Sequence, residues 1–183
     1  VIRGVSYKPE DLTSKLTDNE FVLLRSNNIS NMVVNFKDIN YVNRNALNDK
    51  QILETGDVLI CMSNGSKDLV GKAAEFVSSE YERVSVGSFC AIFRPNKSSI
   101  GNLAKYLFQS ETYRKHISLL ISGSNINNLK NSDIEGLEFN IKSEIATDVV
   151  LVEVKSIEEQ LKNQIILLHK SSFIKRGLIN EIF

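Results

Sequence analysis

Residues 155–183 carry the pattern that most restricts the fold of this chain, because it fits a long helix and little else. The segment opens with Ser156-Ile157-Glu158-Glu159, a capping box in which the serine oxygen accepts a hydrogen bond from a free backbone amide and the glutamate reaches back. Apolar residues then recur near a seven-residue spacing, interrupted at Ser172 and Lys175. These residues are Leu161, Ile165, Leu168, Ile179 and Ile182.

A helix of this extent is longer than a small domain can cover with its own core, since about 27 residues span about 40 Å. The repeat therefore predicts a spacer helix of coiled-coil type that pairs with another helix. The alternative is a terminal helix docked on its own domain.

Residues 1–153 read as a mixed α and β domain. Apolar or alternating runs predict strands at 21–25, 32–36, 58–62, 84–94, 137–141 and 149–154. Helical spacing predicts one helix around 103–107, capped near Ser98 or Ser99, and a second that begins at Ser110 and ends in the turn at 122–125. Strands and helices do not alternate regularly. The fold class is therefore α+β with a mixed or mostly antiparallel sheet, followed by the long helix, and not a doubly wound fold.

Charge and composition exclude several classes of protein. Among 183 residues, 22 Lys and Arg balance 22 Asp and Glu, so the chain is not a uniformly basic nucleic-acid binder. Residues 61–120 nevertheless hold a small excess of basic side chains, which allows a basic face. Cys61 and Cys90 sit in apolar runs and are expected to be buried thiols. No signal peptide or membrane-length apolar run is present, which predicts a cytoplasmic protein.

The sequence motifs of several enzyme classes are missing. The only prolines are Pro9 and Pro95, so the Asp/Asn-Pro-Pro-aromatic tetrapeptide of DNA amino-methyltransferases cannot occur. No glycine-rich phosphate loop is present. His116 and His169 lie far apart without a cluster of acids or cysteines, so we expect no metal site. The residues favour a binding module over an enzyme.

Asparagines cluster in the expected loops, and two interpretations remain open. Asparagine tolerates the left-handed turn conformations that loops require. Its side chain also hydrogen-bonds the edge of adenine bidentately in the DNA major groove.

Several short segments, in order along the chain, resemble the target recognition domain of type I restriction–modification specificity subunits. The segments are 4–11 (GVSYKPED), 24–29 (LRSNNI), 53–60 (LETGDVLI), 63–66 (SNGS), 70–73 (VGKA), 87–89 (GSF), 93–95 (FRP), 106–107 (YL), 122–126 (SGSNI), 129–137 (LKNSDIEGL) and 157–160 (IEEQ). The last resembles the Glu-Gln that opens the family's spacer helix. Prolines often precede that helix in the family, whereas this chain has Ile141-Lys142 and Lys155-Ser156 at those positions.

The resemblance implies sequence-specific binding of double-stranded DNA without catalysis. Modification and restriction subunits would bring S-adenosylmethionine, ATP and Mg²⁺, methylate adenine and cleave DNA. A full specificity subunit has two recognition domains and two helices, so this chain corresponds to half a subunit or a half-length form. The alternatives are a recognition domain of a fused methyltransferase or restriction enzyme, and a protein-interaction module.

Polar loop residues beside the family's segments are the predicted DNA contacts. They are Arg25, Asn27, Asn28, Lys37, Arg44, Ser63, Asn64, Ser66, Lys67 and Lys72. A single spacer helix leaves its apolar stripe uncovered. We therefore expect an antiparallel homodimer through residues 155–183, with a two-fold symmetric split DNA target.

Overall fold

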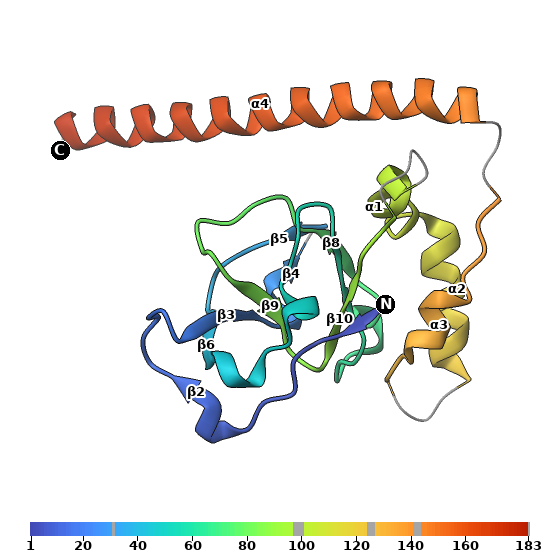
Figure 1. Cartoon of the computed structure of the whole chain (residues 1–183). Coiled ribbons are helices and arrows are strands. Elements are labelled where there is room, and N and C mark those ends of the chain that lie inside the picture. The colour runs from blue at the N-terminus through green and yellow to red at the C-terminus, as the bar shows by residue number, and fades with distance from the viewer. Residues whose placement is uncertain (31, 97–100, 124–126, 141–143, 183) are drawn as a thin grey trace. The chain divides into compact units, whose positions relative to one another are not determined.

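The computed structural model describes residues 1–30, 32–96, 101–123, 127–140 and 144–182 (Figure 1). It divides into two compact units, Val1–Glu138 and Phe139–Phe183, and each is described by itself.

Two sheets form the first unit. The six-stranded sheet has the order β1-β10-β7-β8-β5-β4, and the four-stranded sheet has the order β2-β6-β3-β9. Their bounds are β1 Ile2–Arg3, β2 Leu12–Thr13, β3 Glu20–Leu24, β4 Ile29–Ser30, β5 Val33–Val34, β6 Asn40–Asn43, β7 Val58–Cys61, β8 Ala73–Glu75, β9 Val84–Val86 and β10 Cys90–Phe93. The pairs β3–β9 and β5–β8 are parallel and the other pairs are antiparallel, so the expected mixed α+β fold is confirmed.

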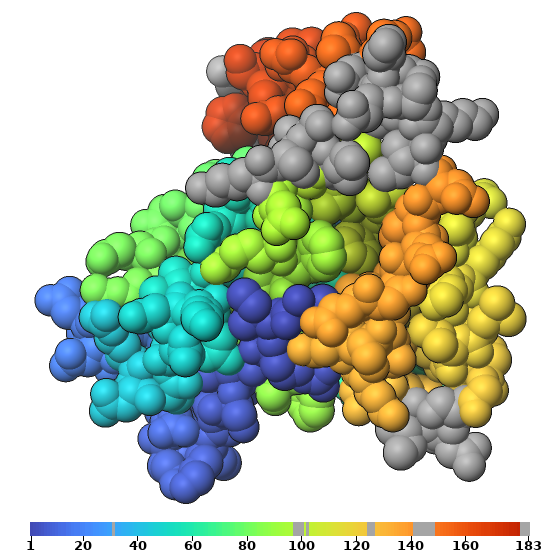
Figure 2. Space-filling model, turned by 45° about the vertical axis from the view of Figure 1, so that its right-hand side comes forward, coloured from blue at the N-terminus to red at the C-terminus, as the bar shows by residue number. Residues whose placement is uncertain are grey.

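Short helices complete this unit. They are α1 Ala104–Leu107, α2 Glu111–Ser122 and α3 Asn131–Glu135, with 3₁₀ turns at Pro9–Asp11, Ser26–Asn28, Arg44–Ala46, Asp49–Gln51, Lys67–Leu69 and Gly101–Leu103. The α-helices gather on one side of the sheets (Figure 1). Figure 2 shows the N-terminal residues, in blue, against the orange segment around α3. There Arg3 Nη1 donates to the Leu129 carbonyl (3.3 Å) and Asn131 Nδ2 to the Val1 carbonyl (3.4 Å).

The main core lies between the two sheets. Val22 and Leu24 of β3 pack in one cluster with Leu59 of β7 and Ile92 of β10. The alternate side chains of β3, Phe21 and Leu23, join a smaller cluster on the other face. Burial of both faces explains why β3 and β7 are continuous apolar runs rather than alternating ones.

Several expected elements are confirmed. The runs at 21–25 and 58–62 form β3 and β7, and the run at 84–94 is split by a turn into β9 and β10. Helix α2 begins after Ser110, whose hydroxyl accepts from the Tyr113 amide at 3.2 Å. The expected caps Ser98 and Ser99 and the end of the 122–125 turn lie outside the described residues.

Two expected strands are wrong. Residues 137–140 form no strand, and residues 149–154 belong to helix α4, Glu144–Ile182. Ser156 therefore lies inside this helix and does not cap it. No proline interrupts the segment. Its valines also continue the seven-residue spacing toward the N-terminus through Val150, Val154 and Ile157, so helical periodicity outweighs their β propensity.

Most of the large apolar side chains of α4 are exposed. In the predicted stripe, Leu161, Ile165, Leu168 and Ile179 are each more than 40% exposed, while the side chain of Ile182 lies outside the described residues. The earlier start of the helix adds Val150 to this stripe, and Ile157 of the expected segment falls at the same spacing; both are more than half exposed. Among the described helices, none is long and apolar enough to span a membrane.

Candidate nucleic-acid interface

The loops that follow β3, β7 and β9 meet at one end of the sheets. The Gly87 amide, after β9, donates to the Leu24 carbonyl at 2.9 Å. The amides of Met62 and Ser63, after β7, donate to the Phe89 carbonyl at 2.8 and 3.1 Å. Parallel pairing of β3 with β9 brings their carboxyl ends together, and the antiparallel β7–β10 pair adds the end of β7. Segments far apart in sequence thus form one continuous surface.

A network of hydrogen bonds builds the loop after β3. Arg25 Nη2 donates to Asp38 Oδ2 at 3.0 Å and to the Asp38 carbonyl at 2.8 Å. The exposed Asn27 contacts the same carboxylate at 3.4 Å through its amide nitrogen. Lys37, next to Asp38, is exposed. Arg25, Asn27 and Lys37 are therefore brought together by the structure.

Asn28, by contrast, is a structural residue. It is fully buried, and its Nδ2 donates to the carbonyls of Asn35 (3.1 Å) and Lys37 (2.7 Å), while its Oδ1 accepts from the Arg25 amide (2.8 Å). These bonds use both donors and one acceptor site of its carboxamide. The side chain holds two loops together and is not displayed to a ligand.

The loop after β7 is joined to the loop after β3. Asn64 Nδ2 donates to Ser26 Oγ at 3.3 Å, and Asn64 Oδ1 accepts from the Ser66 amide at 3.0 Å. Ser66 and Lys67 are exposed beyond it, and Ser63 is half-buried. This arrangement displays hydroxyl, amide and ammonium groups from a braced backbone.

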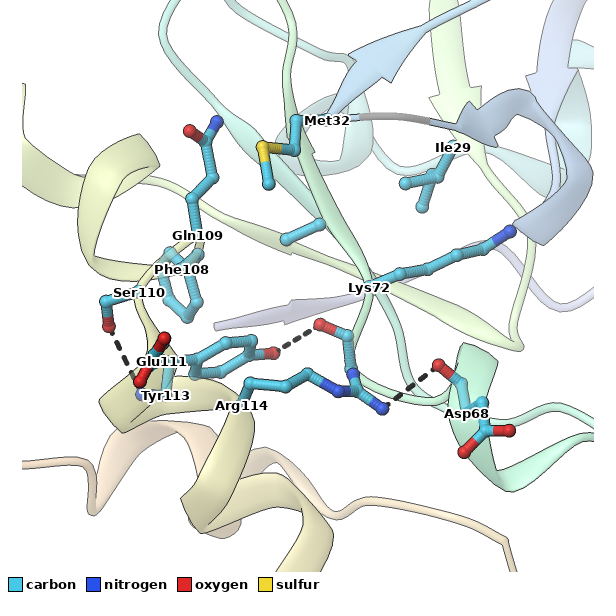
Figure 3. Close-up of a pocket in the computed structure, with 12 residues that line it drawn as sticks. Ile29, Met32, Asp68, Lys72, Phe108, Gln109, Ser110, Glu111, Tyr113 and Arg114 are labelled. Carbon is cyan, nitrogen blue, oxygen red and sulfur yellow. Dashed lines mark hydrogen bonds between the residues drawn. The ribbon is translucent and has the colours of Figure 1, made fainter. Parts of the chain in front are cut away.

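Lys72 lies on a neighbouring cavity of about 400 Å³ (Figure 3). Ile29, Met32 and Phe108 supply much of its apolar wall. Arg114 also lines the cavity, but its guanidinium donates hydrogen bonds to the carbonyls of Val70 (2.7 Å) and Asp68 (3.0 Å). The Gly71 amide donates to the Cys61 carbonyl at 2.7 Å, which ties this segment to the end of β7.

Arg44 lies at the opposite end of the four-stranded sheet. It follows β6, and its amide donates to the Asn19 carbonyl at 2.8 Å, just before β3 begins. Because β6 runs antiparallel to β3, this end is a strand length away from Arg25. The structure does not bring Arg44 to the other predicted residues.

Two buried cysteines lie on the strands next to these loops, Cys61 at the end of β7 and Cys90 at the start of β10. Cys61 and Cys90 are register partners on β7 and β10, and both thiols are free and buried, as expected. Burial raises the pKa of Cys61 and raises that of Cys90 to about 12. Both are therefore neutral core residues near neutral pH.

Phe89, Asn127 and Asn128 also border this surface but were not predicted as site residues. The Asn64 amide donates to the Asn127 carbonyl at 3.3 Å, and Ser63 forms an isolated bridge with Asn128. Both asparagines stand in an asparagine-rich loop sequence, which was the available signal. Among the described residues, no group of three or more His, Cys, Asp or Glu side chains could hold a metal ion.

No protein-family model matches the chain. Two curated proteins do. The chain is 35% identical over 165 residues to the type I restriction enzyme StySPI specificity subunit of Salmonella potsdam. It is 35% identical over 161 residues to the type I restriction enzyme EcoKI specificity subunit of Escherichia coli strain K12. Each match covers 88% of this chain and 33% of the relative, so the chain spans about a third of the length of the relatives it matches. Over most of its length, the chain is thus a homologue of part of the specificity subunits of type I restriction enzymes.

Proposed function

We propose that the chain is a DNA-recognition unit of a type I restriction–modification system, equivalent to one half of a specificity subunit. The observation that carries this proposal is the 35% identity to two such subunits over 88% of the chain. In this function the chain selects a sequence in double-stranded DNA. Partner subunits methylate adenine there and cleave DNA that lacks the modification.

The loops at the common end of the sheets are the proposed DNA surface. It combines exposed or half-exposed cations, which suit phosphates, with hydroxyl and carboxamide groups, which suit base edges. Its members are Arg25, Asn27, Lys37, Ser63, Asn64, Ser66, Lys67 and Lys72. Asn28 is omitted because it is buried, and Arg44 because it lies at the other end.

The chemistry belongs to the partners in this proposal. The chain recognises DNA and is not itself the enzyme. Modification and restriction subunits hold S-adenosylmethionine, ATP and Mg²⁺. The compartment is the cytoplasm, where these subunits meet bacterial DNA.

Helix α4 is the proposed spacer. Its exposed stripe, Val150, Ile157, Leu161, Ile165, Leu168 and Ile179, would be covered by the same helix of a second copy. Antiparallel pairing places two recognition units with two-fold symmetry. The expected target is then a split site whose halves are inverted repeats.

Mapping of methyladenine tests the function. The chain is co-expressed with the modification subunit of its system in a host without other adenine methylation, and the genome is sequenced for N6-methyladenine. We expect methylation confined to one split motif, dependent on the chain. Lys67→Ala with Lys72→Ala should weaken binding of DNA and lower the salt dependence of affinity by about one unit of slope for each phosphate that is no longer neutralised. Methylation that is absent, or unchanged without the chain, contradicts the proposal.

A further inference from the structure

Phe89 is an exposed aromatic residue at the end of the sheets where the proposed DNA-contacting loops meet. It occupies the turn between β9 and β10 and is 67% exposed. The residues that follow it, Cys90 and Ala91, are almost fully buried. Its neighbours fill the core, so the ring itself stays available to a partner, and aromatic side chains contribute much of the contact energy at interfaces.

The backbone around the ring is held by hydrogen bonds. The Phe89 carbonyl accepts from the amides of Met62 (2.8 Å) and Ser63 (3.1 Å). The Cys90 amide closes the turn onto the Gly87 carbonyl at 2.8 Å. An aromatic side chain has few rotatable bonds, so a ring on such a fixed turn loses little conformational entropy when it makes a contact.

The groups around the turn favour DNA as that contact. Ser63 forms an isolated β-bridge with Asn128, and Asn127 Nδ2 donates to the Gly65 carbonyl at 3.0 Å. The turn that carries Phe89 is therefore flanked by hydroxyl and carboxamide groups. Carboxamides read adenine edges in the major groove, and apolar side chains contact the thymine methyl group of the same base pair. Lys67 lies on the same loop system, where it can reach phosphates.

We propose that Phe89 is a base-contacting residue of the DNA surface, whose ring packs on the C5-methyl group of a thymine in the target. This rests on the proposed function and adds a specificity-determining residue outside the predicted set.

The test compares Phe89→Ala with Val77→Ala. Val77 is 62% exposed, but it follows β8 at the end of the sheet where β7 begins, with its carbonyl held by Thr55 Oγ1 at 2.9 Å. The wild-type chain, assembled with its modification subunit, first selects its target from random duplex DNA. Affinities for that target and for an unrelated duplex are then measured. Phe89→Ala should weaken binding of the target about tenfold and of the unrelated duplex less than about twofold. Val77→Ala should change neither, and neither variant should alter the unfolding temperature.

A second arm identifies the contact. Each thymine of the target is replaced in turn by deoxyuridine, which lacks the methyl group. One replacement should weaken the wild type severalfold and leave Phe89→Ala unaffected. Equal target affinity of Phe89→Ala and wild type overturns the inference, and so does loss of assembly with the modification subunit at unchanged DNA selection. Absence of any selected sequence with the wild type overturns the proposed function itself.

Discussion

Asp57 and Arg94 form a bidentate ion pair that joins the start of β7 to the end of β10. Arg94 Nε and Nη2 donate to the two carboxylate oxygens at 2.9 and 2.8 Å, and Asp57 is 1% exposed. Arg94 also reaches Glu54 (2.8 Å) and the Ile52 carbonyl (2.7 Å), and its hydrogen bonding to Asp57 raises the pKa of Arg94. Both residues belong to segments that carry the family resemblance. Their role in this structure is to fix two central strands.

Replacing Arg94 by Met should lower the free energy of unfolding by about 3 kcal/mol, because it leaves the Asp57 carboxylate buried without its cation. Asp57→Asn in the same background should recover part of this loss, since no charge is then stranded. Lys115→Met, which breaks an exposed pair with Glu111, is the control and should cost less than about 0.5 kcal/mol. Denaturant titration measures all three. Equal losses in Arg94→Met and Lys115→Met would show that the buried pair adds nothing.

Substitution of Asn28 should lower stability, whereas substitution of its neighbour Asn27 should weaken DNA binding. Asn28→Ala removes three internal hydrogen bonds and takes the side-chain partner from the Arg25 amide and from the carbonyls of Asn35 and Lys37, so we expect a loss of about 2 kcal/mol in unfolding free energy. Asn27→Ala should leave stability within about 0.5 kcal/mol and weaken DNA binding instead. Thermal unfolding and DNA titration of both variants separate the two effects. An Asn28→Ala variant that is as stable as the wild type but binds DNA more weakly would show that Asn28 contacts DNA.

The raised pKa of Cys90 predicts a loss of stability in alkali. Below the pKa of the unfolded thiol, about 8.5, both states keep the proton and contribute no pH dependence. Above it the unfolded thiol ionises, while burial keeps the folded thiol protonated up to its pKa of about 12. The free energy of unfolding should therefore fall as pH rises through this window. Cys90→Ala should flatten the fall measured between pH 8.5 and 10.5, whatever its packing cost at pH 7. An unchanged slope would contradict the assigned cause.

Sequence patterns predicted the strands and helices that a few neighbouring residues determine. The apolar run at 58–62 marks a buried strand, and Ser110 marks a helix start, because burial and capping act within a few residues. Two-residue strands such as β1 and β2 escaped prediction, since pairing with the distant strands β10 and β6 defines them. Residues 149–154 were misassigned because a short valine-rich run suits a strand and a helix equally.

The candidate site was predictable in residue type more than in position. Loop asparagines and lysines were found from the sequence. It takes the parallel β3–β9 pair to show that Arg25 and Phe89 share an end, and the antiparallel β3–β6 pair to show that Arg44 lies at the other. Asn28 could not be told from Asn27 by sequence, because burial depends on the contacts of loop 35–38.

The exposed stripe of α4 predicts self-association through this helix. Burying each Leu or Ile contributes about 1.5–3 kcal/mol, so a few of them offset the entropy lost on association. A carboxylate inside such an interface would remain without a partner. Sedimentation at tens of micromolar should therefore show a dimer for the wild type and a monomer for Leu161→Asp with Leu168→Asp. Ile157→Asp should weaken the dimer as well, because Ile157 lies four residues before Leu161 in the continuous helix and so belongs to the same stripe. Asn163→Asp adds the same charge on the opposite face, two residues or about 200° from Leu161, and should leave the dimer intact. A wild-type monomer at these concentrations, or equal effects of Leu161→Asp and Asn163→Asp, would reject pairing through this stripe.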